Sequence, residues 1–148
     1  MFYGTFEHAL DEKNRLMIPS KLREEIPEAE GRVFYVTRGL DSCLFAYTQQ
    51  GWQQVVSKLQ AGRESMKSAN ARNFLRLFFG HAMRQELDTA GRILLPDPLR
   101  QMAGIRRDVA LVGVMDRVEI WEKGRWARLE RSNQPRYEKF AEAAELFG

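Results

Sequence analysis

The first ten residues alternate in the two-residue period of a β-strand. Phe2, Phe6 and Leu10 fall on one side of this pattern, and polar side chains such as Thr5 and Glu7 fall on the other. A polar tetrad, residues 11–14, interrupts the alternation, and three aliphatic residues follow Arg15. This order predicts a strand, a tight turn and a second, short strand.

A second copy of this pattern occurs 77 residues later. Residues 11–23 (DEKNRLMIPSKLR) align without a gap on residues 88–100 (DTAGRILLPDPLR), with five identities in 13 positions. Ordinary residue usage would give roughly one identity. Residues 33–36 then align with 109–112, and 44–47 with 118–121, so that the offset falls to 76 and then to 74. The sequence therefore predicts two copies of one supersecondary unit.

Each copy places an Asp-x-x-x-Arg segment at the tip of a predicted hairpin. Asn14 tolerates a positive φ better than most residues, and Gly91 occupies the same position in the second copy. Both residues indicate a tight turn with a left-handed residue. The carboxylates of Asp11 and Asp88 are expected to accept bonds from the turn amides or to pair with the arginine.

Helices follow each hairpin. Short helices are predicted over 21–26 and 98–102, with Ser20 and Asp97 as N-caps. Longer helices are predicted over 52–59 and 69–79, another opens near Trp126, and an amphipathic helix over 137–147 has to dock on some surface. The fold class is α+β, mainly β.

No linker rich in Gly, Ser or Pro divides the two copies, so they should share one core. We divide the chain into a first unit (1–50), a helical connection (51–79), a second unit (80–125) and a C-terminal helix (126–148).

Composition narrows the class of protein. The chain has 148 residues, of which 44% are hydrophobic and 29% charged, with a single cysteine. Cys43 cannot form an intrachain disulfide, no apolar run is long enough to span a membrane, and Glu7 interrupts any leader-like stretch. These features predict a cytoplasmic protein with no membrane partner.

The net charge of +3 is too small to bind nucleic acid as a whole, so any such site needs local concentration of positive charge. Residues 13–23 contain four basic residues and no acid, and residues 89–107 contain four arginines and one acid. Arginine and lysine at these places suit phosphate oxygens, and arginine also suits the guanine edge. The candidate DNA-binding residues are Lys13, Asn14, Arg15, Lys21, Arg23, Arg92 and Arg100.

Simpler interpretations stand beside this one. Arg15 and Arg92 could only hold the turns by pairing with Asp11 and Asp88, and Arg23 and Arg100 could be solvated helix residues. Arg72 and Arg76 are expected to be surface or interface charges, His8 and His81 hydrogen-bonded core residues, Trp121 and Trp126 core or subunit contacts, and Cys43 a buried apolar residue.

Enzyme motifs are missing. The sequence contains no glycine-rich phosphate loop, nucleophile elbow or His-Glu-x-x-His segment, and its few His and Cys residues lie far apart. We expect no catalytic site, cofactor, metal or small-molecule substrate.

The paired Asp-x-x-x-Arg-(apolar)₃-Pro-x-x-Leu-Arg motifs resemble the MraZ family of bacterial transcriptional regulators. The opening MFYG, the RLFFGHA segment at 76–82 and the strand at 119–121 are similar to that family too. The resemblance covers roughly residues 1–130. One departure is Asn14, where the family usually has glycine.

This resemblance implies two AbrB-like (SpoVT-AbrB) swapped-hairpin units that form a pseudo-symmetric β-barrel with flanking helices. It also implies a homo-oligomer, expected to be a ring, and a nucleoid-associated regulator. Such a regulator binds short repeated sites on double-stranded DNA at the promoter of the division and cell-wall gene cluster. Arg15 and Arg23, with Arg92 and Arg100 by the repeat, are the arginines that the resemblance implies face DNA. An AbrB-type assembly or antitoxin-like module that binds a partner and does not read DNA is the alternative.

Overall fold

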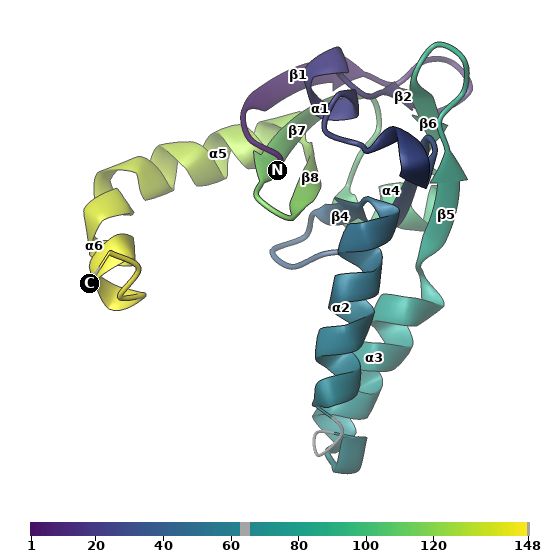
Figure 1. Cartoon of the computed structure of the whole chain (residues 1–148). Coiled ribbons are helices and arrows are strands. Elements are labelled where there is room, and N and C mark those ends of the chain that lie inside the picture. Colours follow the sequence, from purple (N-terminus) through teal and green to yellow (C-terminus); the bar gives the residue numbers. More distant parts are fainter. Residues whose placement is uncertain (63–65, 148) are drawn as a thin grey trace.

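The computed structural model describes residues 1–62 and 66–147 (Figure 1). Its strands form two antiparallel sheets. The strands are β1 (Thr5–Ala9), β2 (Arg15–Met17), β3 (Val33–Arg38), β4 (Leu44–Tyr47), β5 (Met83–Glu86), β6 (Arg92–Leu94), β7 (Asp108–Val114) and β8 (Arg117–Glu122). The helices are α1 (Ser20–Arg23), α2 (Gln49–Ala61), α3 (Ala69–Gly80), α4 (Asp97–Ala103), α5 (Lys123–Asn133) and α6 (Tyr137–Ala143), with short 3-10 turns η1 (Glu28–Glu30) and η3 (Gln134–Arg136). This agrees with the predicted mixed, mainly β class.

The strands of the two halves interleave. One sheet has the order β1-β7-β8-β4-β3-β5, and β2 pairs with β6 in a separate two-stranded ladder. Strands β1 and β2 flank the first turn but do not form a ladder with each other, because β1 pairs with β7 and β2 with β6. The large sheet is open, with β1 and β5 at its edges, so the predicted closed barrel is not confirmed.

A pseudo-two-fold relationship is visible in the strand pairing. Leu16 lies opposite Ile93 in the β2–β6 ladder, and Phe45 lies opposite Glu119 in the β4–β8 ladder. In each pair the two residues occupy the same place in the sequence alignment. The pseudo-two-fold axis that relates the two halves therefore passes through both ladders, between the two residues of each of these pairs.

One part of the sequence alignment was wrong by a residue. β1 places Phe6 opposite Leu111, and β5 places Met83 opposite Val36. Since Phe6 and Met83 correspond, Val36 corresponds to Leu111, which is an offset of 75 and not 76. The pairing of β3 with β4 and of β7 with β8 gives the same offset. The apolar run of β3 matches that of β7 almost equally well in either register, so sequence alone could not choose.

The core lies between the two halves. Leu16, Phe34 and Leu111 are fully buried in its main cluster. On the other side of the sheet Trp52 of α2 stacks between Tyr35 and Phe78, with ring centroids 5.4 and 5.7 Å apart. These aromatic contacts attach the α2–α3 hairpin to the sheet.

The two predicted N-caps were wrong. Pro19 and Pro96 are the N-cap residues of α1 and α4, and neither Ser20 nor Asp97 makes a capping bond. Each proline holds the extended backbone that precedes the helix, which moves the next residue into the first turn. Asp97 instead pairs with Arg100 one turn along α4.

The C-terminal segment leaves the body of the molecule. α5 begins at the Glu122 cap, whose carboxylate accepts bonds from the amides of Gly124 and Arg125. Beyond η3, α6 ends at Ala143 and packs on no part of the sheet, with Tyr137 70% and Phe147 87% exposed. The predicted amphipathic helix is thus shorter than expected and does not dock within the chain. None of the described helices combines the length and apolar character needed to cross a membrane.

Candidate nucleic-acid interface

Asp11 organises the first turn with both carboxylate oxygens. Its Oδ1 accepts bonds from the backbone amides of Lys13 and Arg15, each at 2.9 Å, and its Oδ2 accepts one from Arg15 Nε at 2.7 Å. Asn14 has a φ of 61°, as predicted for this position. Both alternatives left open by the sequence therefore occur together in one turn.

The second turn repeats these contacts. Asp88 Oδ1 accepts the amides of Ala90 and Arg92 at 3.0 and 2.9 Å, and its Oδ2 accepts Arg92 Nε at 2.8 Å. Gly91 has a φ of 88°. The same residue types therefore build the same geometry twice.

Hydrogen bonding lowers the pKa of both carboxyl groups. The backbone amide of Arg15 makes the largest contribution to lowering the pKa of Asp11, and the amide of Arg92 does the same for Asp88. Both aspartates are therefore ionised at neutral pH. Each negative charge offsets part of the positive charge of its arginine.

The two turns lie side by side at one end of the molecule (Figure 1). The amide of Ile18 donates to the carbonyl of Gly91 at 2.9 Å, and the amide of Leu95 donates to the carbonyl of Asn14 at 3.0 Å. Arg92 Nη1 also lies 3.5 Å from Asp11 Oδ2 in the other half. We call residues 11–15 and 88–92 the paired turns, because these contacts hold them next to each other.

The arginines of the two short helices bond to the backbone just after each of the paired turns. Arg23 Nε donates to the carbonyl of Ile18 at 2.8 Å, and Arg100 Nε donates to that of Leu95 at 2.9 Å. The Arg23 guanidinium lies over Gly91, where an added Cβ would be 2.7 Å from Nη1. Neither arginine is a freely solvated helix residue, since both are half-buried.

Lys13 and Lys21 are exposed at the edge of this surface. The side chains of Arg15 and Arg92 are 33% and 30% exposed. Only Nε of Arg15 has a partner among the described residues, so both of its terminal nitrogens are available. The structure brings all seven candidate residues to the same end of the chain's fold.

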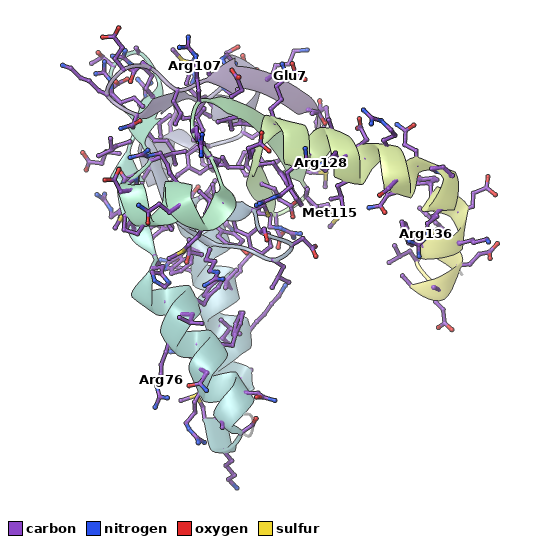
Figure 2. The ribbon with its side chains drawn as sticks, turned by 180° about the vertical axis from the view of Figure 1, so that it is seen from behind. Glu7, Arg76, Arg107, Met115, Arg128 and Arg136 are labelled. Atoms are coloured by element: carbon purple, nitrogen blue, oxygen red, sulfur yellow. The ribbon has the colours of Figure 1, made fainter. Side chains whose placement is uncertain are left out.

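Two further arginines lie at this end and are not among the seven candidate DNA-binding residues. The carbonyl of Arg107 accepts the amide of Leu10, and the carbonyl of Arg32 accepts the amide of Leu87, so each arginine sits beside the residue that precedes a turn aspartate. Both side chains are exposed. Figure 2 labels Arg107 at this end, far from Arg76 on the α2–α3 hairpin and Arg136 near the C-terminus. With the offset of 75 that the structure gives, Arg32 corresponds to Arg107. The offset of 76 from the sequence alignment would place Asp108 opposite Arg32 instead.

The remaining chemistry-bearing residues lie elsewhere. Cys43 is buried, as expected, and burial raises the pKa of its thiol to about 12. The histidines are not core residues, since His8 and His81 are both partly exposed. The described residues contain no group of three or more His, Cys, Asp or Glu side chains able to hold a metal ion.

Comparison with known proteins bears on the family of this chain. A family profile described as "MraZ protein, putative antitoxin-like" matches twice, over residues 1–77 and 78–147. A protein of Moorella thermoacetica named Transcriptional regulator MraZ is 45% identical over 142 residues, covering 96% of this chain and 95% of that protein. Proteins of the same name from Syntrophomonas wolfei and Acetivibrio thermocellus are 45% and 40% identical, over 96% and 100% of this chain and 95% and 99% of their own lengths.

Proposed function

The chain belongs to the MraZ family, and on that basis we propose how it acts on DNA. Its relatives carry the name of transcriptional regulators, so this chain is a regulator of transcription and not an enzyme. We propose that it reads a specific DNA sequence with the paired turns. The observation that carries this proposal is that backbone hydrogen bonds and the Arg92–Asp11 contact hold the two arginine-bearing turns together at one end of the fold.

The proposed contacts follow from the donors that the turns leave available. Asp11 binds Nε of Arg15, which fixes the direction of the guanidinium while its two terminal nitrogens stay available. Two parallel N–H donors match the O6 and N7 acceptors of guanine in the major groove. Lys13 and Lys21 lie at the rim, where flexible ammonium groups suit phosphates.

Arg92 has a different environment from Arg15. Its Nε donates to Asp88 of its own turn, and its Nη1 also lies 3.5 Å from Asp11 Oδ2 in the other half. One of its terminal nitrogens is therefore partly engaged before any DNA arrives. We infer that Arg15 contributes more to base recognition than Arg92, while both lie on the contact surface.

We also propose that the chain works as a homo-oligomer, in a ring, on several adjacent repeats of its site. One end with a few available cations neutralises only a few phosphates, so a single chain would bind poorly at cellular salt. In an oligomer, once one chain has bound its repeat, the other chains bind the neighbouring repeats intramolecularly. This raises the overall affinity for DNA by roughly 10²–10⁴. The sites would lie at the promoter of the division and cell-wall gene cluster, in the cytoplasm at the nucleoid.

Binding to DNA carrying one, two and three repeats from upstream of the protein's own gene tests the proposal. We expect affinity to rise steeply with repeat number, and the logarithm of the binding constant to fall linearly with the logarithm of salt concentration. Arg15→Ala should lower affinity and reduce the salt slope by about 1. Arg38→Ala, an exposed arginine at the far end of β3, is the control. No binding to any of these DNAs would favour the antitoxin-like alternative, in which the surface contacts a protein.

A further inference from the structure

The C-terminal arm, residues 123–147, carries apolar side chains that no part of its own chain covers. Leu146 is 71% exposed and Phe147 87% exposed, and Tyr137 and Phe140 are also exposed. The first turns of α5 pack on β7 and β8, with Trp126 and Leu129 against the core cluster that contains Trp121. Figures 1 and 2 show the end of α5 and α6 projecting away from the sheet in both views. Exposed apolar surface of this extent on a projecting element is typical of an interaction site.

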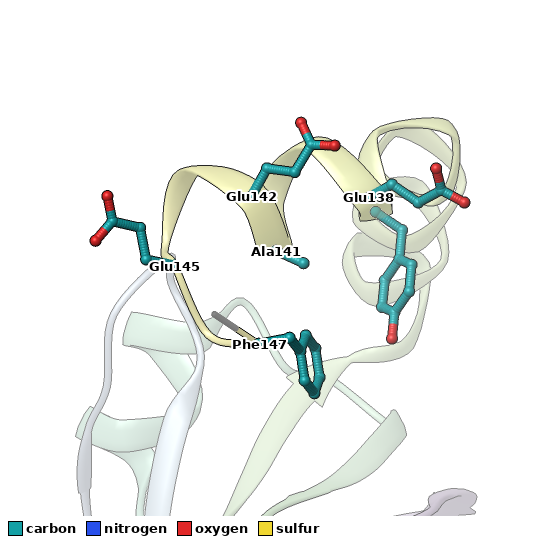
Figure 3. Close-up of a pocket in the computed structure, with 6 residues that line it drawn as sticks. Glu138, Ala141, Glu142, Glu145 and Phe147 are labelled. Atoms are coloured by element: carbon teal, nitrogen blue, oxygen red, sulfur yellow. The ribbon is translucent and has the colours of Figure 1, made fainter.

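The arm has an apolar groove and a separate hollow with acidic side chains. A groove of about 430 Å³ lies between α5 and α6, lined by Trp126, Leu129, Tyr137 and Phe140. A second hollow, formed by α6 and the residues that follow it, combines Ala141 and Phe147 with Glu138, Glu142 and Glu145. Figure 3 shows the carboxylates of Glu138 and Glu142 on α6, and that of Glu145 just after it, pointing away from Phe147. The arm as a whole is not acidic, since residues 123–147 contain six Lys and Arg residues and four Glu. The acidic character belongs to this second hollow, whose lining includes three Glu and no Lys or Arg. A partner for the hollow should therefore be apolar and positively charged.

The α2–α3 hairpin has that character. In the sequence, residues 49–80 contain five Lys and Arg residues and one acid. Exposed apolar side chains accompany this charge: Met66 is 47%, Phe74 43% and Leu77 48% exposed. Lys58 and Arg76 are exposed on the same hairpin.

The hairpin and the arm leave the body separately, so they can meet only between two copies of the chain (Figures 1 and 2). We propose that the arm of one copy docks on the α2–α3 hairpin of the next, with the carboxylates of α6 facing the cations of the hairpin. This contact uses different surfaces on the two copies, and repetition of such a head-to-tail contact closes a ring when the rotation permits. The inference rests on the proposed assembly and names the surfaces that make it.

A charge-exchange experiment tests this contact by light scattering coupled to size-exclusion chromatography. Glu138→Lys with Glu142→Lys places positive charge against the basic hairpin, and we expect the assembly to fall to a single chain of 17.2 kDa. Lys58→Glu with Arg76→Glu should do the same by placing negative charge against Glu138, Glu142 and Glu145 of the arm. The quadruple variant restores opposite charges, and we expect it to regain the original mass.

Two further variants complete the test. Leu146→Ser with Phe147→Ser removes only exposed apolar surface, so the fold should persist while the assembly weakens at least tenfold. Glu24→Lys with Glu28→Lys reverses two exposed charges on the body and should leave the mass unchanged.

If the quadruple variant does not regain the mass lost by the double variants, the arm does not bind the hairpin. If the wild-type chain assembles and no arm or hairpin variant changes its mass, the docking inference is overturned while the proposed assembly stands. A wild-type chain that remains single at all concentrations overturns both.

Discussion

Leu16 and Ile93 lie directly opposite each other in the β2–β6 ladder, and the two residues are counterparts in the repeated sequence. Their side chains are 0% and 1% exposed. They therefore join the two halves of the core at the base of the paired turns. A change at either residue should affect both halves at once.

We expect Leu16→Ala and Ile93→Ala each to lower the free energy of unfolding by roughly 2–5 kcal/mol, because each leaves a cavity in a close-packed core. The double variant should deviate from the sum of the single effects by roughly 0.5–3 kcal/mol, since the two residues are direct neighbours. Urea unfolding followed by circular dichroism measures these values. Additive effects would show that the two positions relax independently.

Arg32→Ala and Arg107→Ala should each weaken binding of the proposed DNA site and reduce the salt slope by about 1. The two arginines occupy equivalent exposed places beside the turns, so their effects should be similar in size. Arg38→Ala, at the opposite end of β3 from Arg32, should leave affinity unchanged. Binding titrations at several salt concentrations provide the measurement, and equal affinity of all three variants and the wild type would remove this pair from the interface.

Gly91→Ala should destabilise the protein by at least about 1–2 kcal/mol, because a φ of 88° is unfavourable for any residue with a Cβ. The added Cβ would also lie 2.7 Å from Arg23 Nη1, so the Arg23 side chain would have to move. Asn14→Gly should change stability by less than about 0.5 kcal/mol, since asparagine already tolerates a left-handed backbone and glycine fits it as well. Thermal melts of the two variants make the comparison. Equal destabilisation by both substitutions would contradict the left-handed geometry of the second turn.

Stability should decrease as the pH falls below about 3.9, the ordinary pKa of aspartate. Asp11 and Asp88 have lowered pKa values in the folded state, so their contribution is complete above the ordinary value and is lost as the pH falls through the lowered one. Melting temperatures at pH 7, 4 and 3 measure this loss. The double variant Asp11→Asn, Asp88→Asn should show a smaller decrease than the wild type, and the exposed Asp108→Asn should behave like the wild type. A decrease of the same size in the double variant would assign the acid sensitivity to other groups.

Local features were predictable because short-range chemistry determines them. Asn14 and Gly91, each three residues after an aspartate, identified both turns because these residue types tolerate a positive φ. The 3.6-residue period of apolar side chains located α2 and α3. The placement of the caps failed because a proline before a serine or aspartate changes which residue begins the helix.

Long-range features could not be obtained in the same way. Nothing in the two-residue period of β1 specifies that its partner is β7, more than a hundred residues along the chain. The same limitation concealed Arg32, because an apolar strand fits its counterpart in neighbouring registers almost equally well. The segment boundaries at 50, 79 and 125 stay a prediction.

Four of the six ladders join a strand from residues 1–62 to one from residues 66–147. The chain thus resembles a symmetric dimer whose two subunits have been tied together by a peptide connection. Such a tether keeps the partners at a fixed effective concentration, so formation of the fold does not depend on how dilute the protein is. It also frees the two halves to diverge, because each half always meets the other and never a second copy of itself.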